Sequence, residues 1–158
     1  MWNEQIIMML LEGIKDTLYM TLTSTLIGYV IGLPMGILLT VTDKDGIHPN
    51  TAVYKVLDVI ANLIRSVPFL ILLIVLIPFT RFLIGRSYGP TATIVPLVIA
   101  AAPYIARMVE SSLKEVDAGV IEAARSMGAS NFTIVTKVML VEARTSLSLI
   151  HISEPTRP

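Results

Sequence analysis

A short polar segment between two apolar runs carries the residues best suited to recognise another molecule. It contains the sequence Glu122-Ala123-Ala124-Arg125-Ser126-Met127-Gly128. At helical spacing its apolar face consists of Val120, Ile121, Ala124 and Met127. Asp117 can cap the start of this helix, and Gly128 can take the left-handed conformation that ends it, before Ser130 or Asn131 caps the next helix. Composition alone favours an ordinary surface helix, and a docking site for a partner is the alternative.

The sequence lacks the patterns of the common catalytic sites. It holds no Gly-x-x-x-x-Gly-Lys-Ser/Thr phosphate loop, and neither a Ser/His/Asp arrangement nor a catalytic pair of carboxylates emerges. Cysteine is absent, which excludes disulfides, thiol catalysis and thiolate metal sites. His48 stands beside Pro49 in a polar connector and is interpreted as a solvated loop residue, and His151 is given no ligand role. We therefore expect no enzyme, no metal site and no directly bound cofactor.

Composition points to the lipid bilayer as the solvent. Hydrophobic residues make up 54% of the chain and charged residues 15%, whereas about 25% of residues are charged in a soluble domain. The net charge is zero and no basic cluster occurs, which argues against nucleic-acid binding. The first residues also lack the positive start of a cleavable signal peptide. We expect an all-α, polytopic membrane protein whose first hydrophobic segment stays attached.

The first predicted membrane span covers residues 17–42, which contain no charge. Small side chains recur in it at every fourth position and form one stripe on a helix: Ser24, Gly28, Gly32 and Gly36. Such a stripe permits close approach of another helix, which is a main source of helix association in lipid. The alternative is that glycine is simply more frequent in membrane helices. Pro34 should bend this helix.

A second span is predicted over residues 54–80, with a break or kink at Pro68. Asp58 and Arg65 would lie on its first turns and share a face. An ion-paired, an interior-facing and a headgroup-level position explain the two charges equally well. A direct functional role for Arg65 and Pro68 competes with two simpler explanations, a snorkelling arginine and a tolerated kink.

A third span is predicted over residues 87–106, which contain Pro90, Pro96 and Pro103. Interrupted helices in transporters mark moving or substrate-facing segments, so Pro103 is a candidate hinge. A proline-rich helix whose freed carbonyls bond to neighbouring helices is the slightly favoured alternative.

The polar segment resembles the EAA loop of bacterial ABC importer permeases, from Glu122 to Gly128 and on to Val138 and Leu140. Further similarity to the methionine-uptake members of this family appears in three stretches: Arg65-Ser66-Val67-Pro68-Phe69, Ile77-Pro78-Phe79-Thr80-Arg81 and Ala101-Ala102-Pro103-Tyr104-Ile105-Ala106-Arg107-Met108-Val109-Glu110. The similarity covers roughly residues 9–143. Val141 departs from it, because family members usually carry proline there, which puts the turn into the next span in doubt.

The resemblance implies a type I permease domain in the bacterial inner membrane that imports D- or L-methionine. It implies a second permease copy, an extracytoplasmic methionine-binding protein and a separate ABC ATPase that uses ATP. Docking of that ATPase is expected on the coupling loop at about residues 117–141, with contacts from Glu122, Ala123, Ala124, Arg125, Met127 and Gly128.

Two alternatives to methionine import are carried forward. One is a permease for another amino acid or small organic solute, and the other is a small channel or membrane-assembly protein without an ATPase. An ATPase that co-purifies with the chain would separate the second alternative from the other functions.

The end of the chain does not continue the resemblance. Residues 144–158, and Ser148 to Pro158 above all, resemble translated sequencing-adapter DNA fused to a truncated gene. We therefore expect residues 1–143 to be a partial permease domain and residues 144–158 to be a non-native tail, although a genuine short variant is the alternative.

Overall fold

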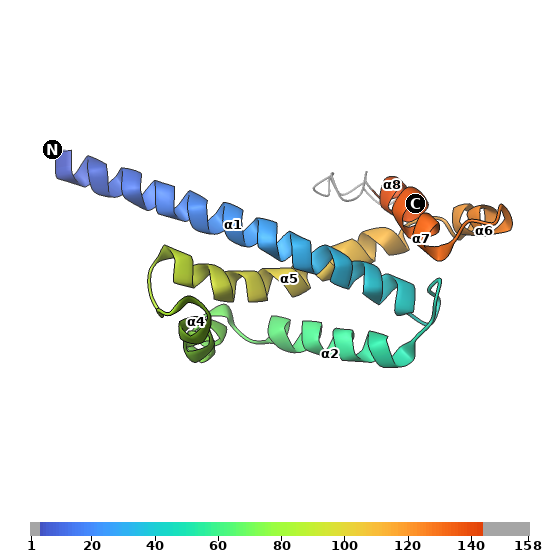
Figure 1. The fold of residues 1–158 in the computed structure, drawn as a ribbon, viewed down its shortest axis with the longest axis horizontal. Coiled ribbons are helices and arrows are strands. Elements are labelled where there is room, and N and C mark those ends of the chain that lie inside the picture. Colours follow the sequence, from blue (N-terminus) through green and yellow to red (C-terminus); the bar gives the residue numbers. More distant parts are fainter. Residues whose placement is uncertain (1–3, 144–158) are drawn as a thin grey trace, which may run out of the picture. The chain divides into compact units, whose positions relative to one another are not determined.

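A computed structural model describes residues 4–143 of the chain, and every regular element in that part is a helix (Figure 1). The long helices are α1 (Glu4–Thr42), α2 (Thr51–Ser66) and α5 (Pro90–Lys114). The shorter ones are α3 (Phe69–Val75), α4 (Ile77–Ile84), α6 (Ala118–Ser126), α7 (Asn131–Thr133), the π-helix η1 (Ile134–Met139) and α8 (Leu140–Glu142). The predicted all-α class is confirmed for these residues. The predicted tail, residues 144–158, lies outside the described part.

The chain divides into two compact units. Within residues 4–143, unit 1 combines residues 4–32 with Val59–Ile105, and unit 2 combines Leu33–Asp58 with residues 106–143. Helices α1, α2 and α5 each contribute residues to both units. The hollow beside the α2–α3 break belongs to unit 1, whereas α6 and the ion pairs around Glu110 belong to unit 2.

Two described helices, α1 and α5, are long and apolar enough to cross a membrane, and the bent pair α2–α3 would make a third span if it crosses as one. Helix α1 begins at Glu4, so it is longer than the predicted span at 17–42. Helix α5 continues past residue 106 to Lys114, because the charges that follow are ion-paired along the helix. The absence of charge was therefore too strict a criterion for the helix ends.

The break predicted at Pro68, within the second span at residues 54–80, is confirmed. Helix α2 ends at Ser66, α3 starts after Pro68, and the two helices are bent by 105°. A second interruption follows at Leu76, before α4. Proline has no amide hydrogen and disfavours helical backbone in the residue before it, so the break at Pro68 was predictable, but its angle was not.

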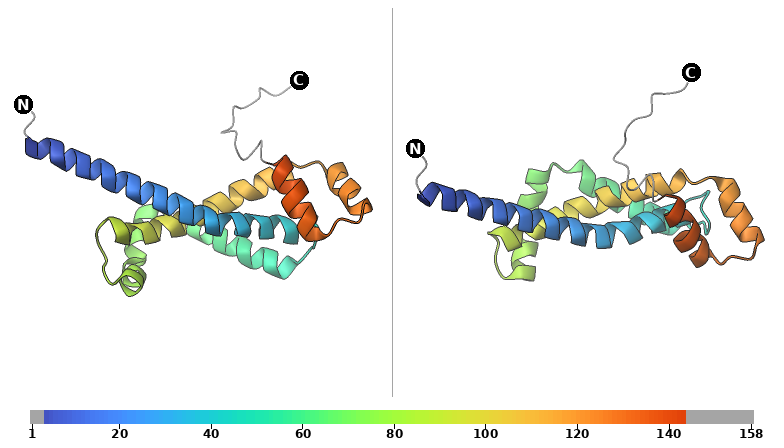
Figure 2. Two further views of the ribbon diagram at one scale, coloured as in Figure 1. Left: turned by 45° about the horizontal axis from the view of Figure 1, so that its top comes forward. Right: turned by 90° about the horizontal axis from the view of Figure 1, so that it is seen from above.

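Helices α1 and α5 cross in both ribbon figures (Figures 1 and 2). Three glycines of α1 approach residues of α5: Gly28, Gly32 and Gly36. In unit 1, a Cβ atom added to Gly32 would stand 2.7 Å from the carbonyl oxygen of Ala102. In unit 2, a Cβ on Gly36 would stand 2.5 Å from the carbonyl oxygen of Ala106. A side chain at either position would force the two backbones apart.

Two further positions complete the stripe. A Cβ on Gly28 would meet the Cβ of Ala101 at 3.2 Å, which is a less severe contact. Ser24 is buried, and its hydroxyl donates to the Met20 carbonyl in the preceding turn at 2.6 Å. The hydroxyl is therefore satisfied within its own helix.

Replacement of Gly32 by leucine should destabilise the protein, because the added side chain has no room between α1 and α5. Overpacking of this kind costs about 1–3 kcal/mol. The thermal midpoint of the purified protein in detergent, measured for Gly32→Leu, should fall. Gly13→Leu is the matched control on the same helix, because an added Cβ there meets nothing within 4 Å. Equal midpoints for the two variants would contradict the close contact.

Candidate functional site

Helix α6 is fixed at both ends by its own sequence. At the start, the Oδ1 atom of Asp117 accepts a hydrogen bond from the Gly119 amide at 2.7 Å. At the end, Gly128 has a left-handed φ of 81°, and the amide of Ala129 donates to the Ala124 carbonyl at 3.1 Å. This is the Schellman arrangement that ends a helix at a glycine. Ser130 caps the next helix by accepting from the Thr133 amide. The predicted caps at Asp117 and Gly128 are confirmed, and of the two candidates for the next cap the structure selects Ser130.

The apolar face of α6 is only partly buried. Ala124 is buried and Ile121 is half-buried, whereas Val120 and Met127 are exposed, Met127 to 81%. The turn at Gly128 leaves Met127 beyond the packed part of the helix. An exposed methionine provides a flexible apolar contact surface.

Three further residues of the predicted docking segment face solvent. Glu122, Ala123 and Arg125 are all exposed. The Arg125 guanidinium also donates to the Ile47 carbonyl at 3.2 Å. This bond ties α6 to the loop at residues 43–50, which joins α1 to α2.

The loop at residues 43–50 folds back tightly on the end of α1. The His48 amide donates to the Val41 carbonyl at 3.0 Å, and the Asn50 amide donates to the Thr42 carbonyl at 2.9 Å. A Cβ on Gly46 would approach the Val41 carbonyl oxygen to 2.4 Å, so only glycine fits there. A cavity of about 190 Å³ separates this loop from α6, and its lining includes Thr40, Ile47, Ile121, Glu122 and Met139.

Behind the loop, five charged side chains form a connected set in unit 2, which we call the Glu110 network: Asp43, Asp58, Arg107, Glu110 and Lys114. Glu110 is only 5% exposed, and its carboxylate contacts Arg107 at 2.7 Å and Lys114 at 2.8 Å. Arg107 also pairs with Asp58 on α2, and Lys114 also pairs with Asp43 at 2.7 Å.

One aromatic residue joins the Glu110 network. The Tyr54 hydroxyl donates to Glu110 at 3.4 Å, and the Lys114 ammonium lies 5.8 Å from the centre of the Tyr54 ring. These contacts link the start of α2 to the end of α5. The Glu110 carboxylate and the side chains paired around it thus join the end of α1, the first half of α2 and the end of α5.

The outermost pair of the network is sensitive to acid. The hydrogen bond from Lys114 holds the pKa of the Asp43 carboxyl below its ordinary value, and partial burial opposes this shift. Because the folded-state pKa is lowered, the pair stabilises the protein fully above the unfolded pKa of about 3.9 and loses that contribution as the pH falls through the folded value. The pair is therefore intact at neutral pH.

Of the remaining predicted site residues, Arg65, Pro68 and Pro103 belong to unit 1, whereas α6 belongs to unit 2. Asp58 pairs with Arg107 and not with Arg65. Arg65 stands on the last turn of α2 and lines a hollow in unit 1, and Pro68 caps the start of α3. Pro103 is buried inside α5. Among residues 4–143, no group of three metal-ligating side chains occurs.

Sequence reasoning missed the Glu110 network as a unit. Its signal was the spacing of Arg107, Glu110 and Lys114 at three and four residues, which places them on one helix face. The partners on α2 and beyond α1 come from distant parts of the sequence, so the pairing itself had no local signal.

Replacement of Glu110 by glutamine should destabilise unit 2 more than the loss of any surface charge. Removing one partner of a buried ion pair costs about 3–5 kcal/mol, because it leaves buried charge uncompensated. We expect Glu110→Gln near the lower end of that range, because Arg107 and Lys114 each keep a second carboxylate. Asp45→Asn is the control, because that side chain is 85% exposed and its loss should change stability by less than about 0.5 kcal/mol. Similar thermal midpoints for both variants would contradict the proposed contribution of Glu110 to stability.

Comparisons with known proteins agree on the family. The family described as "Binding-protein-dependent transport system inner membrane component" matches residues 7–148. The D-methionine transport system permease proteins MetI of Salmonella typhimurium strain LT2 and Escherichia coli strain K12 are each 50% identical over 141 residues, which cover 89% of this chain and 65% of each relative. The chain thus spans about two thirds of the length of these relatives.

Solved structures give the same result. A structure described as inward-facing conformations of the MetNI methionine ABC transporter matches with a TM-score of 0.89 and 49% identity, over 92% of this chain and 68% of that one. An amino acid ABC transporter crystallised with histidines matches with a TM-score of 0.54 and 26% identity, over 85% of this chain and 64% of that one. The chain belongs to the family of inner membrane components of binding-protein-dependent transport systems.

Proposed function

We propose that this chain is the permease part of an ATP-driven importer that moves methionine, in its D or L form, across the bacterial cytoplasmic membrane. The 50% identity to a D-methionine permease carries this proposal. The match to the MetNI transporter, at a TM-score of 0.89, supports it at the level of the fold. The working importer would contain a second permease copy, a separate ABC ATPase that hydrolyses ATP, and an extracytoplasmic methionine-binding protein.

The coupling loop at about residues 117–141 is the proposed docking site of the ATPase. Helix α6 offers exposed Glu122, Ala123 and Met127 to a partner, and its ends are fixed by Asp117 and Gly128. A short helix that is fixed at both ends moves as a rigid body when a partner pushes it. Its bond to the Ile47 carbonyl would pass that displacement to the loop between α1 and α2.

Three further roles belong to this proposal. The first is helix packing, which is supported by the close approach of α1 and α5 and is assigned to Ser24, Gly28, Gly32 and Gly36. Pro68 and Pro103 are proposed as points where helices of the transport pathway bend. Arg65 is proposed to face that pathway.

A permease for another amino acid is the second candidate. The amino acid ABC transporter crystallised with histidines shares 26% identity with this chain, which supports the broader class of amino acid importers. The higher identity to methionine permeases favours methionine as the substrate.

A chimera tests the substrate directly. Residues 7–143 of this chain would replace the aligned segment of the Salmonella typhimurium D-methionine permease in a strain that lacks its own copy. We expect the chimera to restore uptake of labelled D-methionine, with competition by unlabelled methionine and not by histidine. A chimera that assembles with the ATPase but imports a different amino acid would contradict the methionine assignment.

Replacement of Gly128 by valine should weaken association with the ATPase, because a β-branched residue is strained at a φ of 81°. Strain at such a position costs about 1–3 kcal/mol and would displace the end of α6. Co-purification of the ATPase with the tagged permease measures the effect.

Gly85→Val is the matched control for this experiment. Gly85 ends α4 with a φ of 80°, so valine there imposes the same strain away from the docking helix. We expect ATPase association to fall for Gly128→Val and to persist for Gly85→Val. Equal association in the two variants would remove the docking role of this turn.

A further inference from the structure

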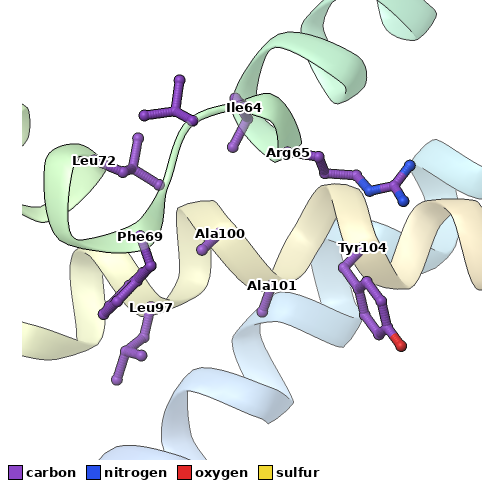
Figure 3. A pocket seen from close by; sticks show the side chains of 9 residues that line it. Ile64, Arg65, Phe69, Leu72, Leu97, Ala100, Ala101 and Tyr104 are labelled. Atoms are coloured by element: carbon purple, nitrogen blue, oxygen red, sulfur yellow. The ribbon is translucent and has the colours of Figure 1, made fainter.

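A hollow of about 540 Å³ lies in unit 1, where the break between α2 and α3 faces α5 (Figure 3). Its lining is apolar except near one cation. From the broken helix pair come Arg65, Phe69 and Leu72, and from α5 come Leu97, Ala100 and Tyr104. Pockets of about 300–1,000 Å³ with an apolar lining and a few polar groups are typical of small-molecule sites.

The hollow lies beside an interrupted helix. Arg65 is one residue from the end of α2, next to the break before α3. Tyr104 precedes the end of α5 by 10 residues, which is about 15 Å at 1.5 Å per residue. Substrate sites of transporters are found beside interrupted helices.

Arg65 is the unusual residue of the hollow. Arg65 is exposed, and its side chain makes no ion pair and no hydrogen bond within residues 4–143. Arg107 on α5, in contrast, pairs with both Asp58 and Glu110. A charge inside a membrane segment is costly unless an anion or water meets it. The Arg65 guanidinium therefore has an open position for an anionic group.

The position of Arg65 on the last turn of α2 gives a partial explanation. A cation there interacts favourably with the helix dipole, by a few tenths of a kcal/mol up to about 1 kcal/mol. The dipole accounts for a basic residue at the helix end. It does not account for the apolar hollow that the same residue lines.

The two ends of the hollow differ in chemistry. In Figure 3 the Arg65 guanidinium and the Tyr104 ring extend on one side, and Phe69 and Leu97 lie on the other side. Guanidinium binds carboxylate through two parallel hydrogen bonds. The apolar side chains of Phe69 and Leu97 suit an unbranched apolar group. This division matches an amino acid with an apolar side chain.

We propose that this hollow binds the amino acid in transit, with Arg65 holding its α-carboxylate and Phe69 and Leu97 surrounding its side chain. The proposal rests on the importer function proposed above and specifies where this chain meets the substrate. Arg65 then selects substrates that carry a free carboxylate. The guanidinium contact does not depend on which α-carbon configuration presents that carboxylate.

Equilibrium binding to the permease–ATPase complex in lipid nanodiscs tests the site without the binding protein or ATP. Labelled methionine is the probe, and unlabelled methionine and methioninamide, which lacks the carboxylate, are the competitors. The parental complex should prefer methionine over the amide by at least about tenfold, as expected for a charge-assisted hydrogen-bonded pair.

Three variants resolve the role of Arg65. Arg65→Gln should lose at least about tenfold in methionine affinity and lose its preference over the amide. Arg65→Lys keeps the charge but lacks the planar guanidinium group that forms two parallel hydrogen bonds. It should therefore retain part of the methionine affinity and part of the preference over the amide. Arg86→Gln removes an arginine that does not line the hollow and should behave as the parent. Co-elution with the ATPase verifies that each variant assembles.

The outcomes separate this inference from the importer function. The inference would be overturned if Arg65→Gln kept the parental affinity for methionine and the parental preference for methionine over methioninamide. It would also be overturned if that variant lost a bound anionic lipid while its methionine binding stayed unchanged. A parental complex that binds a different amino acid would refute the methionine assignment alone, and the same comparison with that amino acid and its amide would still test Arg65. A parental complex that binds no amino acid would overturn the site.

Discussion

Two cations meet at the buried carboxylate of Glu110, and the ends of three helices depend on that pairing. Arg107 and Lys114 bind it from within α5, and each reaches a second carboxylate, on α2 or just beyond α1. In a membrane protein an unpaired charge that faced lipid would carry a high cost in free energy. The network therefore fixes the relative positions of these helix ends in unit 2, and it allows α5 to continue as a helix through three charged residues.

The Glu110 network connects directly to the proposed docking helix. Helix α5 ends at Lys114, and α6 begins four residues later at Ala118. The loop at residues 43–50 is held by Lys114 at Asp43 and by Arg125 at Ile47. A displacement of α6 thus acts on α1 and α2 through contacts within one compact unit. This arrangement can couple the motion of an ATPase to membrane helices without a change in the helices' internal structure.

The sequence predicted those features that depend on local chemistry. The caps at Asp117 and Gly128, the break at Pro68 and the spacing of small residues on α1 all follow from neighbouring residues. The extension of α5 past residue 106 also had a local signal, the spacing of Arg107, Glu110 and Lys114 on one helix face, but the prediction placed the end of the span at these charges. The partner of Arg107 on α2, 49 positions away, was hidden from any reasoning based on periodicity.

We propose that an ATPase docks on α6, and cysteine protection measures this docking most directly. The chain contains no cysteine, so Met127→Cys supplies a single reactive thiol at a side chain that is 81% exposed. Tyr88→Cys, at a residue 80% exposed before α5, is the control. We expect maleimide labelling at position 127 to slow many-fold when the ATPase is bound, and labelling at position 88 to keep its rate. Equal labelling at position 127 with and without the bound ATPase would contradict the claim.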